Sequence, residues 1–252
     1  MSDIIPDIEI EFDDSFNPTI TSPNCPYGLQ FYQTRESMAD VETYKKFLTN
    51  VKKRFRVSKF YKQYKDYIMN EIGLNRDQTM PNIDGTIATL EMHHNFITLF
   101  EICLLITEHT LKTTGYVSTF DIVQLLKEEH RMNHVPIVIL SKTSHQMVEN
   151  DDEVVLPAQM CFGDWASLLR TYHKGITPML AKKIMHFIQV SIDADKSSET
   201  KLLYNLLEFR DELEGWSRYN EYSDNLRIGA IGYAGNYPGI GYSNTAYIEQ
   251  VD

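Results

Sequence analysis

Apolar residues recur every three or four positions along most of the chain, which is the spacing that lines one face of an α-helix. Within the first such segment the pattern breaks near Arg56–Ser58, where Ser58 can cap a second helix. Later helices begin at Asp164 and at Thr177, which precedes a proline at the first helical position. The predicted helical segments are residues 38–70 in two parts, 97–112, 120–130, 164–172, 177–192 and 201–213.

Two apolar runs are too short for helices and are typical of strands. Thr86–Leu90 leads into the adjacent pair His93 and His94, and Val135–Leu140 leads into a short helix. The two strands and the short helix together predict a small strand–strand–helix unit at residues 86–150, which we call the finger. A helical insertion of about 40 residues separates its two strands. The fold class predicted for the chain is therefore α+β and mostly helical, with helices and extended termini flanking the finger.

Three regions differ in composition. Residues 1–36 combine acidic residues with four prolines and show little helical periodicity, so we expect an extended acidic arm. Residues 37–215 are predicted to be a helical domain that contains the finger. Residues 216–252 are rich in glycine and tyrosine and are predicted to be a tail, in which tyrosines supply contact area for a partner.

Bulk composition excludes several classes of protein. Hydrophobic residues make up 42% of the chain, enough for a core, but no uncharged apolar run reaches 18 residues, so no membrane span is predicted. The acidic N-terminus lacks the features of a signal peptide. Three widely spaced cysteines, Cys25, Cys103 and Cys161, argue against a disulfide framework and favour a reducing compartment. We therefore expect a cytoplasmic protein without membrane contact.

A basic block interrupts a chain whose net charge is -11. Residues 45–65 contain nine basic residues and no acidic one, so this block is the candidate for contacting phosphates. Aromatic residues interleave with the lysines, which suits either stacking on bases or packing into a core. The residues predicted to bind nucleic acid, with DNA as the expected partner, are Lys52, Lys53, Arg54, Arg56, Lys59 and Lys62.

Six of the eight histidines fall between residues 89 and 150, and their pattern is that of a small metal site. His93 and His94 are consecutive on a strand, so one can bind a cation while the other faces a water molecule. His145 and Glu149 are four residues apart on a helix, so both can reach the same ion. The alternative interpretation is that these are ordinary, partly buried histidines.

These residues resemble a known family. The sequence Leu90-Glu91-Met92-His93-His94, followed by an apolar strand that runs into Ser141-Lys142-Thr143-Ser144-His145, is similar to the HNH endonucleases, whose site is a ββα-metal finger, and in particular to those encoded by bacteriophages. The resemblance implies that His94 is the general base and that His93, His145 and Glu149 hold Mg²⁺ or Mn²⁺, with Zn²⁺ or Ni²⁺ as further options. It also implies a location in the host cytoplasm or in a phage virion.

The chain departs from the pattern of this family at three points. Glu149 stands where the family usually has another histidine, although a carboxylate suits hard cations. Pro136 occupies the position of an asparagine that locks the loop of the finger, and Asn133 is the nearest residue that can take this structural role. The helical insertion is also longer than the usual connection.

Three functions follow from these patterns. The first is a metal-dependent endonuclease that hydrolyses the phosphodiester bonds of DNA, with His94 accepting a proton from the attacking water. The second is a structural or assembly protein of a bacteriophage virion that reuses a nuclease-like fold without catalysis, its acidic arm and Gly/Tyr-rich tail binding neighbouring proteins. The third is a nucleic-acid-binding module without cleavage.

Overall fold

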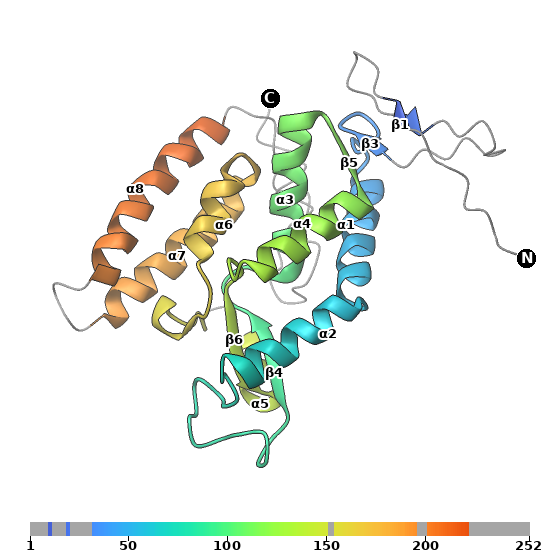
Figure 1. The fold of residues 1–252 in the computed structure, drawn as a ribbon. Coiled ribbons are helices and arrows are strands. Elements are labelled where there is room, and N and C mark those ends of the chain that lie inside the picture. Colours follow the sequence, from blue (N-terminus) through green and yellow to red (C-terminus); the bar gives the residue numbers. More distant parts are fainter. Residues whose placement is uncertain (1–9, 12–18, 21–31, 151–153, 196–200, 222–252) are drawn as a thin grey trace, which may run out of the picture.

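The computed structural model describes residues 10–11, 19–20, 32–150, 154–195 and 201–221. These residues form eight α-helices and three two-stranded antiparallel sheets (Figure 1). The prediction of a mostly helical α+β protein is confirmed. Most of the predicted acidic arm and the tail beyond Glu221 lie outside the described residues. The exceptions within the arm are residues 32–36 and the short pair of strands β1 (Ile10–Glu11) and β2 (Thr19–Ile20).

The first two helices follow the capping signals of the sequence. Asp40 caps α1 (Val41–Arg56), and Ser58 caps α2 (Lys59–Asp66) by accepting a hydrogen bond from the backbone of Tyr61, as predicted. A π-helical turn (Tyr67–Glu71) continues α2. Both helices direct their aromatic side chains inward, and five apolar residues of α1 are buried in the core.

The central helix is α3 (Leu99–Thr114), which is apolar on nearly all sides and correspondingly buried. Thr98 and Glu101 close its N-terminus in a reciprocal capping box, and Gly115 ends it with a backbone φ of 84°. Strand β5 (Tyr116–Ser118) pairs with β3 (Tyr32–Thr34) and leads directly into α4 (Thr119–Arg131). Helices α1, α3 and α4 pack together as the N-terminal half of the molecule (Figure 1).

The finger consists of β4 (Leu90–His94), β6 (Ile137–Ser141) and α5 (Lys142–Asn150), and it lies beside α2 below the helical body in Figure 1. The two strands are antiparallel, with His93 opposite Val138. The first strand begins four residues later than predicted, because Asp84 accepts hydrogen bonds from Thr86 and holds that segment in a turn. The prediction of a strand at Thr86–Leu90 was therefore wrong in its boundaries.

The loop that precedes β4 is fixed to the finger by two polar side chains. Gln78 pairs with the edge of β6 that faces away from β4, where its backbone N–H donates to Ile139 O at 2.9 Å and its side-chain oxygen accepts from Ile139 N at 2.6 Å. Asp77 is fully buried and accepts hydrogen bonds from Ser141 N and Ser144 Oγ at 2.8 and 2.6 Å. The loop, β6 and the start of α5 thus form one hydrogen-bonded unit.

The C-terminal half contains α6 (Trp165–Thr171), α7 (Pro178–Ala194) and α8 (Lys201–Glu221), together with the short 3₁₀ turns Ala158–Met160 and His173–Gly175. Helix α8 continues through Gly215, past the predicted end of the helical domain. An aromatic cluster connects this half to the start of α3: Phe187 stacks on Phe96 and meets Trp165 edge-on. No helix among the described residues has the length and apolarity needed to cross a membrane.

Candidate functional site

Strand β4 separates the two adjacent histidines. The His93 side chain lies toward α5, where its ring centroid is 4.8 Å from that of His145 and the two rings are nearly perpendicular. The His94 side chain lies on the opposite face of the strand and is only 6% exposed. There it meets His130 of α4, with 3.3 Å between their Nε2 atoms. The alternation of side chains along a strand thus places the two imidazoles in different environments.

A carboxylate lies on the same face of β4 as His93. Glu91 is two residues before His93 and therefore shares its face of the strand. Glu91 Oε2 lies 2.6 Å from His145 Nδ1, which joins β4 to the first turns of α5. Burial, and to a smaller extent the nearby His145 and Lys183, lower the pKa of His93 to about 4. We call Glu91, His93 and His145 the finger cluster.

The buried histidine pair has a defined arrangement of protons. A carbonyl oxygen can only accept, so His130 Nδ1 donates to Leu126 O at 2.7 Å. Burial lowers the pKa of His130 to about 4, so the ring is neutral at pH 7 and its Nε2 has no proton. His94 Nε2 must then donate to His130 Nε2. The pKa of His94 is held well below its usual range, mainly by burial and next by the nearby His130.

The surroundings of this pair are aromatic. The His130 ring lies 4.6 Å from that of Phe55 and 5.1 Å from that of Tyr64, measured between centroids. His130 lies in the last turn of α4, where histidines often face solvent, yet it is fully buried. Residues 36 positions apart therefore form a neutral pair inside the core.

The three predicted imidazoles do not converge. His93 and His145 meet, but His94 faces the core and cannot contact a water molecule held between those two rings. Among the described residues, no group of three or more His, Cys, Asp or Glu side chains is placed to hold a metal ion. Glu149 lies in the last turn of α5, and its side chain is outside the described residues. A bound divalent cation stays a prediction from the sequence.

Asn133 contacts a different part of the molecule from the one predicted. It follows α4 with a left-handed φ of 55°. Its side-chain amide lies 3.5 Å from the hydroxyl of Tyr64 and 3.4 Å from that of Tyr67, and its carbonyl accepts from Asp164 N at 2.7 Å. Asn133 thus connects the end of α4 to α2 and to the start of α6.

The basic block follows the outer surface of α1 and α2. Lys53, Arg54, Arg56, Lys59 and Lys62 are exposed, while Lys52 is partly buried with its ammonium 5.5 Å from the ring of Phe100. The interleaved aromatic residues pack into or against the core instead of facing solvent: Phe55, Phe60, Tyr61, Tyr64 and Tyr67. These rings are therefore not placed to stack on bases.

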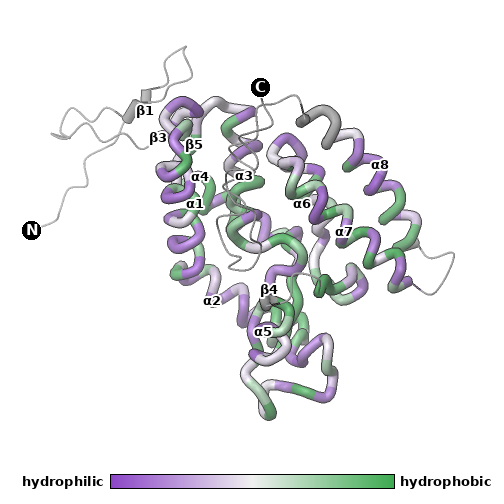
Figure 2. The backbone as a smooth tube through the Cα atoms, turned by 180° about the vertical axis from the view of Figure 1, so that it is seen from behind, coloured by the Kyte–Doolittle hydropathy of each residue, from purple (hydrophilic) through white to green (hydrophobic). Residues whose placement is uncertain are grey.

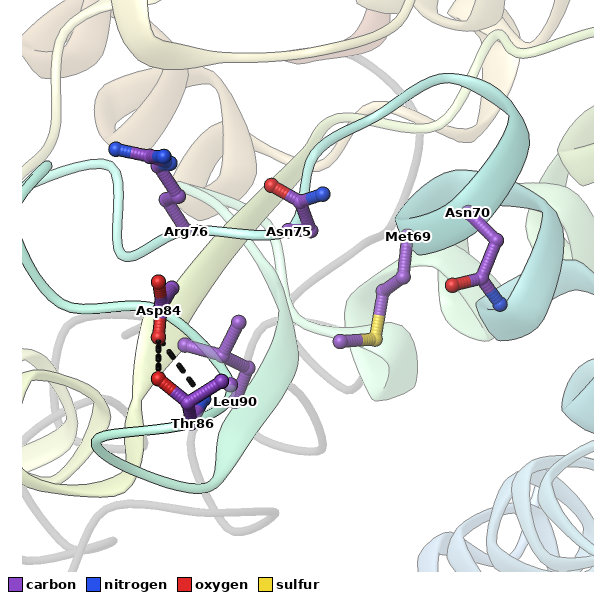
Figure 3. Close-up of a pocket in the computed structure, with 8 residues that line it drawn as sticks. Met69, Asn70, Asn75, Arg76, Asp84, Thr86 and Leu90 are labelled. Carbon is purple, nitrogen blue, oxygen red and sulfur yellow. Dashed lines mark hydrogen bonds between the residues drawn. The ribbon is translucent and has the colours of Figure 1, made fainter.

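A separate pocket of about 340 Å³ lies beside the finger, between the π-helical turn and the loop that precedes β4 (Figure 3). None of the histidines lines it. Its only carboxylate, Asp84, accepts hydrogen bonds from the backbone and hydroxyl of Thr86 at 2.9 and 2.5 Å. The lining residues are Met69, Asn70, Asn75, Arg76, Asp84, Gly85, Thr86 and Leu90.

Comparison with protein families gives a match that covers both halves of the fold. The family model described as bacteriophage G278-like virion protein matches residues 1–214, which include the acidic segment, the basic block, the finger and most of α8. The chain belongs to this family. No curated protein and no solved structure matches it significantly.

Membership in the G278-like virion protein family corrects two predictions. The resemblance to the HNH endonucleases was wrong as a family assignment, because the matched family is one of virion proteins. The predicted DNA-hydrolysing function was wrong for the same reason, and the second interpretation, a bacteriophage virion protein, agrees with the match. The ordering of strand, strand and helix that suggested a nuclease finger is present, and within it His94 is buried against His130.

Sequence reasoning missed three residues of this region. Glu91 stood in the quoted motif without a role, although strand alternation places it beside His93. His130 has no place in the predicted metal site, and nothing local in the sequence connects it to His94. The sequence around Asp77 does not indicate its structural role, because its hydrogen-bond partners lie more than 60 residues away on β6 and α5.

Proposed function

We propose that this chain is a structural component of a bacteriophage particle that is incorporated through contacts with other virion proteins. The observation that carries this proposal is the match of residues 1–214 to a family of virion proteins. The polar groups of the finger also suit a structural role. The Glu91–His145 contact and the bonds of Asp77 fix its strands, loop and helix to one another, so the finger is a rigid unit that other proteins can contact.

The experiment that tests this proposal measures whether the chain is present in purified phage particles. Phage particles are purified through a density gradient, washed at high salt and analysed by mass spectrometry, and immunogold labelling locates the chain on the particle. We expect the chain to remain with the particles, and a phage that lacks its gene to produce incomplete ones. A phage-encoded enzyme of replication serves as the control for carry-over. Absence of the chain from washed particles, with abundant chain in the lysate, overturns the proposal.

We also propose that the finger cluster binds a divalent transition metal, as a property separate from assembly. What supports this is the approach of His93 to His145 and the carboxylate of Glu91 on the His145 ring, since carboxylates commonly orient metal-binding imidazoles. Thermal unfolding with added Zn²⁺ or Ni²⁺ tests it. We expect stabilisation of the native chain that is lost in His145→Ala and kept in His186→Ala, a change at an exposed histidine of α7. Equal shifts in both variants, or none in the native chain, contradict it.

A further inference from the structure

Helices α1 and α2 present a positive surface, and their acidic residues, Glu42 and Asp66, lie only at the outer ends of the two helices. Six exposed cationic side chains, which we call the basic face, lie on these helices, and residues 45–65 contain no acid. Within the part of the chain that the structure describes, none of the six forms an ion pair with a carboxylate, whereas Arg170 pairs with Glu212 elsewhere. The residues of the basic face are Lys46, Lys53, Arg54, Arg56, Lys59 and Lys62.

The basic face extends over both helices. Lys46 and Lys53 are seven residues apart and therefore lie on one side of α1, and Lys59 and Lys62 are three residues apart and share one side of α2. Figure 2 shows stretches of hydrophilic residues along both helices. Side chains three or four residues apart on a helix are about 5–6 Å apart. An extended anionic chain can therefore contact several of these cations in succession.

The sequence contains a segment with the matching charge and spacing. Four carboxylates alternate with apolar residues in the order Asp7-Ile8-Glu9-Ile10-Glu11-Phe12-Asp13. In an extended chain, alternate side chains lie on one side at intervals of roughly 7 Å. The segment would then present a row of carboxylates on one side and apolar side chains on the other. The net charge of -11 opposes the approach of DNA and of a second copy alike, so the attraction must come from local charge complementarity between the acidic segment and the basic face.

We propose that the acidic segment, residues 7–13, of one copy binds the basic face of a neighbouring copy. Strand β3 holds the chain beside the start of α1, whereas α2, which carries Lys59 and Lys62, lies at the opposite end of that helix (Figure 1). A contact between two different surfaces of one chain can be repeated from copy to copy. The inference rests on the proposed role as a particle component, which requires such contacts.

The experiment uses two variants of the full chain with complementary defects. An arm variant (D7N/E9Q/E11Q/D13N) keeps the basic face, and a face variant (K53Q/R56Q/K59Q) keeps the acidic segment. A control variant (R35Q/K142Q/K182Q) removes three other exposed cations. None of the three cations changed in the face variant donates a hydrogen bond to another described residue, so we expect all variants to fold, as checked by circular dichroism.

Sedimentation equilibrium of each protein, alone and mixed, gives the decisive result. We expect the native chain and the control variant to self-associate, with an affinity that falls roughly ten-fold or more when salt is raised from about 0.05 to 0.5 M. Each of the other two variants alone should be a monomer, and their equimolar mixture should form a one-to-one complex. A mixture that stays monomeric overturns the inference, and so does association of either variant alone with native affinity.

A third outcome would assign the basic face to a nucleic acid. If the native chain is a monomer and binds duplex DNA, and the face variant alone loses that binding, the inference is overturned in favour of DNA. The fate of the proposed function is separate from these results. A monomeric chain that is nevertheless found in washed particles overturns the inference and leaves the particle role intact, whereas absence from particles overturns the role itself.

Discussion

The two adjacent histidines of β4 show how strongly position on a strand determines chemistry. His93 is partly buried beside a second imidazole that contacts the Glu91 carboxylate, whereas His94 donates to His130 inside an aromatic core. Burial lowers the pKa of both members of the inner pair. The unfolded chain would titrate these imidazoles near pH 6.5, so between this pH and about 4 it binds more protons than the folded chain does.

This difference predicts a loss of stability in acid. The free energy of unfolding should fall as pH decreases from 6.5 toward 4, by up to about 1.4 kcal/mol per pH unit for each buried imidazole. His94→Gln keeps a donor for His130 but cannot titrate, so its stability should fall less steeply over this range. Urea unfolding at a series of pH values measures the two slopes. His186→Gln, at an exposed position, should follow the native curve, and an unchanged slope in His94→Gln would contradict the buried pair.

The sequence predicts how the side chains of β4 alternate, but not which of its faces is buried. Strand alternation predicts that His93 and His94 face opposite sides, and that Glu91 shares the side of His93. It does not predict which side is core, because that depends on α4 being packed there. The partner of His94 lies 36 residues away, on a helix whose own pattern gives no reason to direct a histidine at β4.

At the scale of elements, one buried carboxylate holds the finger together. Asp77 accepts from Ser141 N and Ser144 Oγ, and it also accepts from the backbone and hydroxyl of Thr79 at 2.8 and 2.6 Å. Burial raises its pKa, but the hydrogen bonds from Ser144, Thr79 and Ser141 outweigh this effect and leave the pKa well below the usual range. The carboxylate is therefore charged throughout the neutral range.

Replacing this carboxylate should loosen the whole finger. Asp77→Ala leaves several buried donors without an acceptor, so we expect a loss of about 3 kcal/mol in the free energy of unfolding. Hydrogen exchange should show that the amide of Ser141 loses protection. Asp84→Ala, in the same loop, removes only the turn bonded to Thr86 and should cost about 1 kcal/mol or less. Equal losses in the two variants would show that Asp77 has no special role.

The 3₁₀ turn His173–Gly175 lies very close to the backbone of α3. Gly175 ends the 3₁₀ turn that packs on α3, and a Cβ atom there would lie 2.0 Å from Leu105 O. Gly175→Ala must displace that turn from α3, so we expect a cost of about 3 kcal/mol. Gly215 lies exposed within α8 with no atom near its missing Cβ, so Gly215→Ala should stabilise by about 0.5–1 kcal/mol. Thermal unfolding of both variants should give shifts of opposite sign.

At the scale of the whole molecule, local signals predicted the helices and long-range packing decided the rest. Ser58, Thr98 and Gly115 mark helix ends through caps that depend on a few neighbouring residues. The basic block was predicted correctly as two helices, but its aromatic residues turned out to face the core. The nuclease interpretation failed because the order of strand, strand and helix is compatible with many functions, and the positions of side chains within it are tertiary properties.

The two halves of the molecule share one aromatic cluster, which predicts that they unfold together. Phe187 of α7 stacks on Phe96 at 3.9 Å and meets Trp165, which in turn packs against Phe209 of α8. Phe96 belongs to the connection between β4 and α3, so the cluster joins the finger, the central helix and the C-terminal helices. A disturbance at Phe187 should therefore reach both halves.

Phe187→Ala should cost about 4 kcal/mol, because it removes a fully buried ring and leaves a cavity. Tryptophan fluorescence reports on the C-terminal half, whereas far-ultraviolet circular dichroism reports on every helix. The two signals should give the same urea midpoint in the native chain, and the variant should shift both midpoints equally. Phe120→Ala, at a ring that is 58% exposed, should shift them by much less. Separate midpoints, or a shift confined to fluorescence, would mean that the halves are independently stable and that the cluster does not couple them.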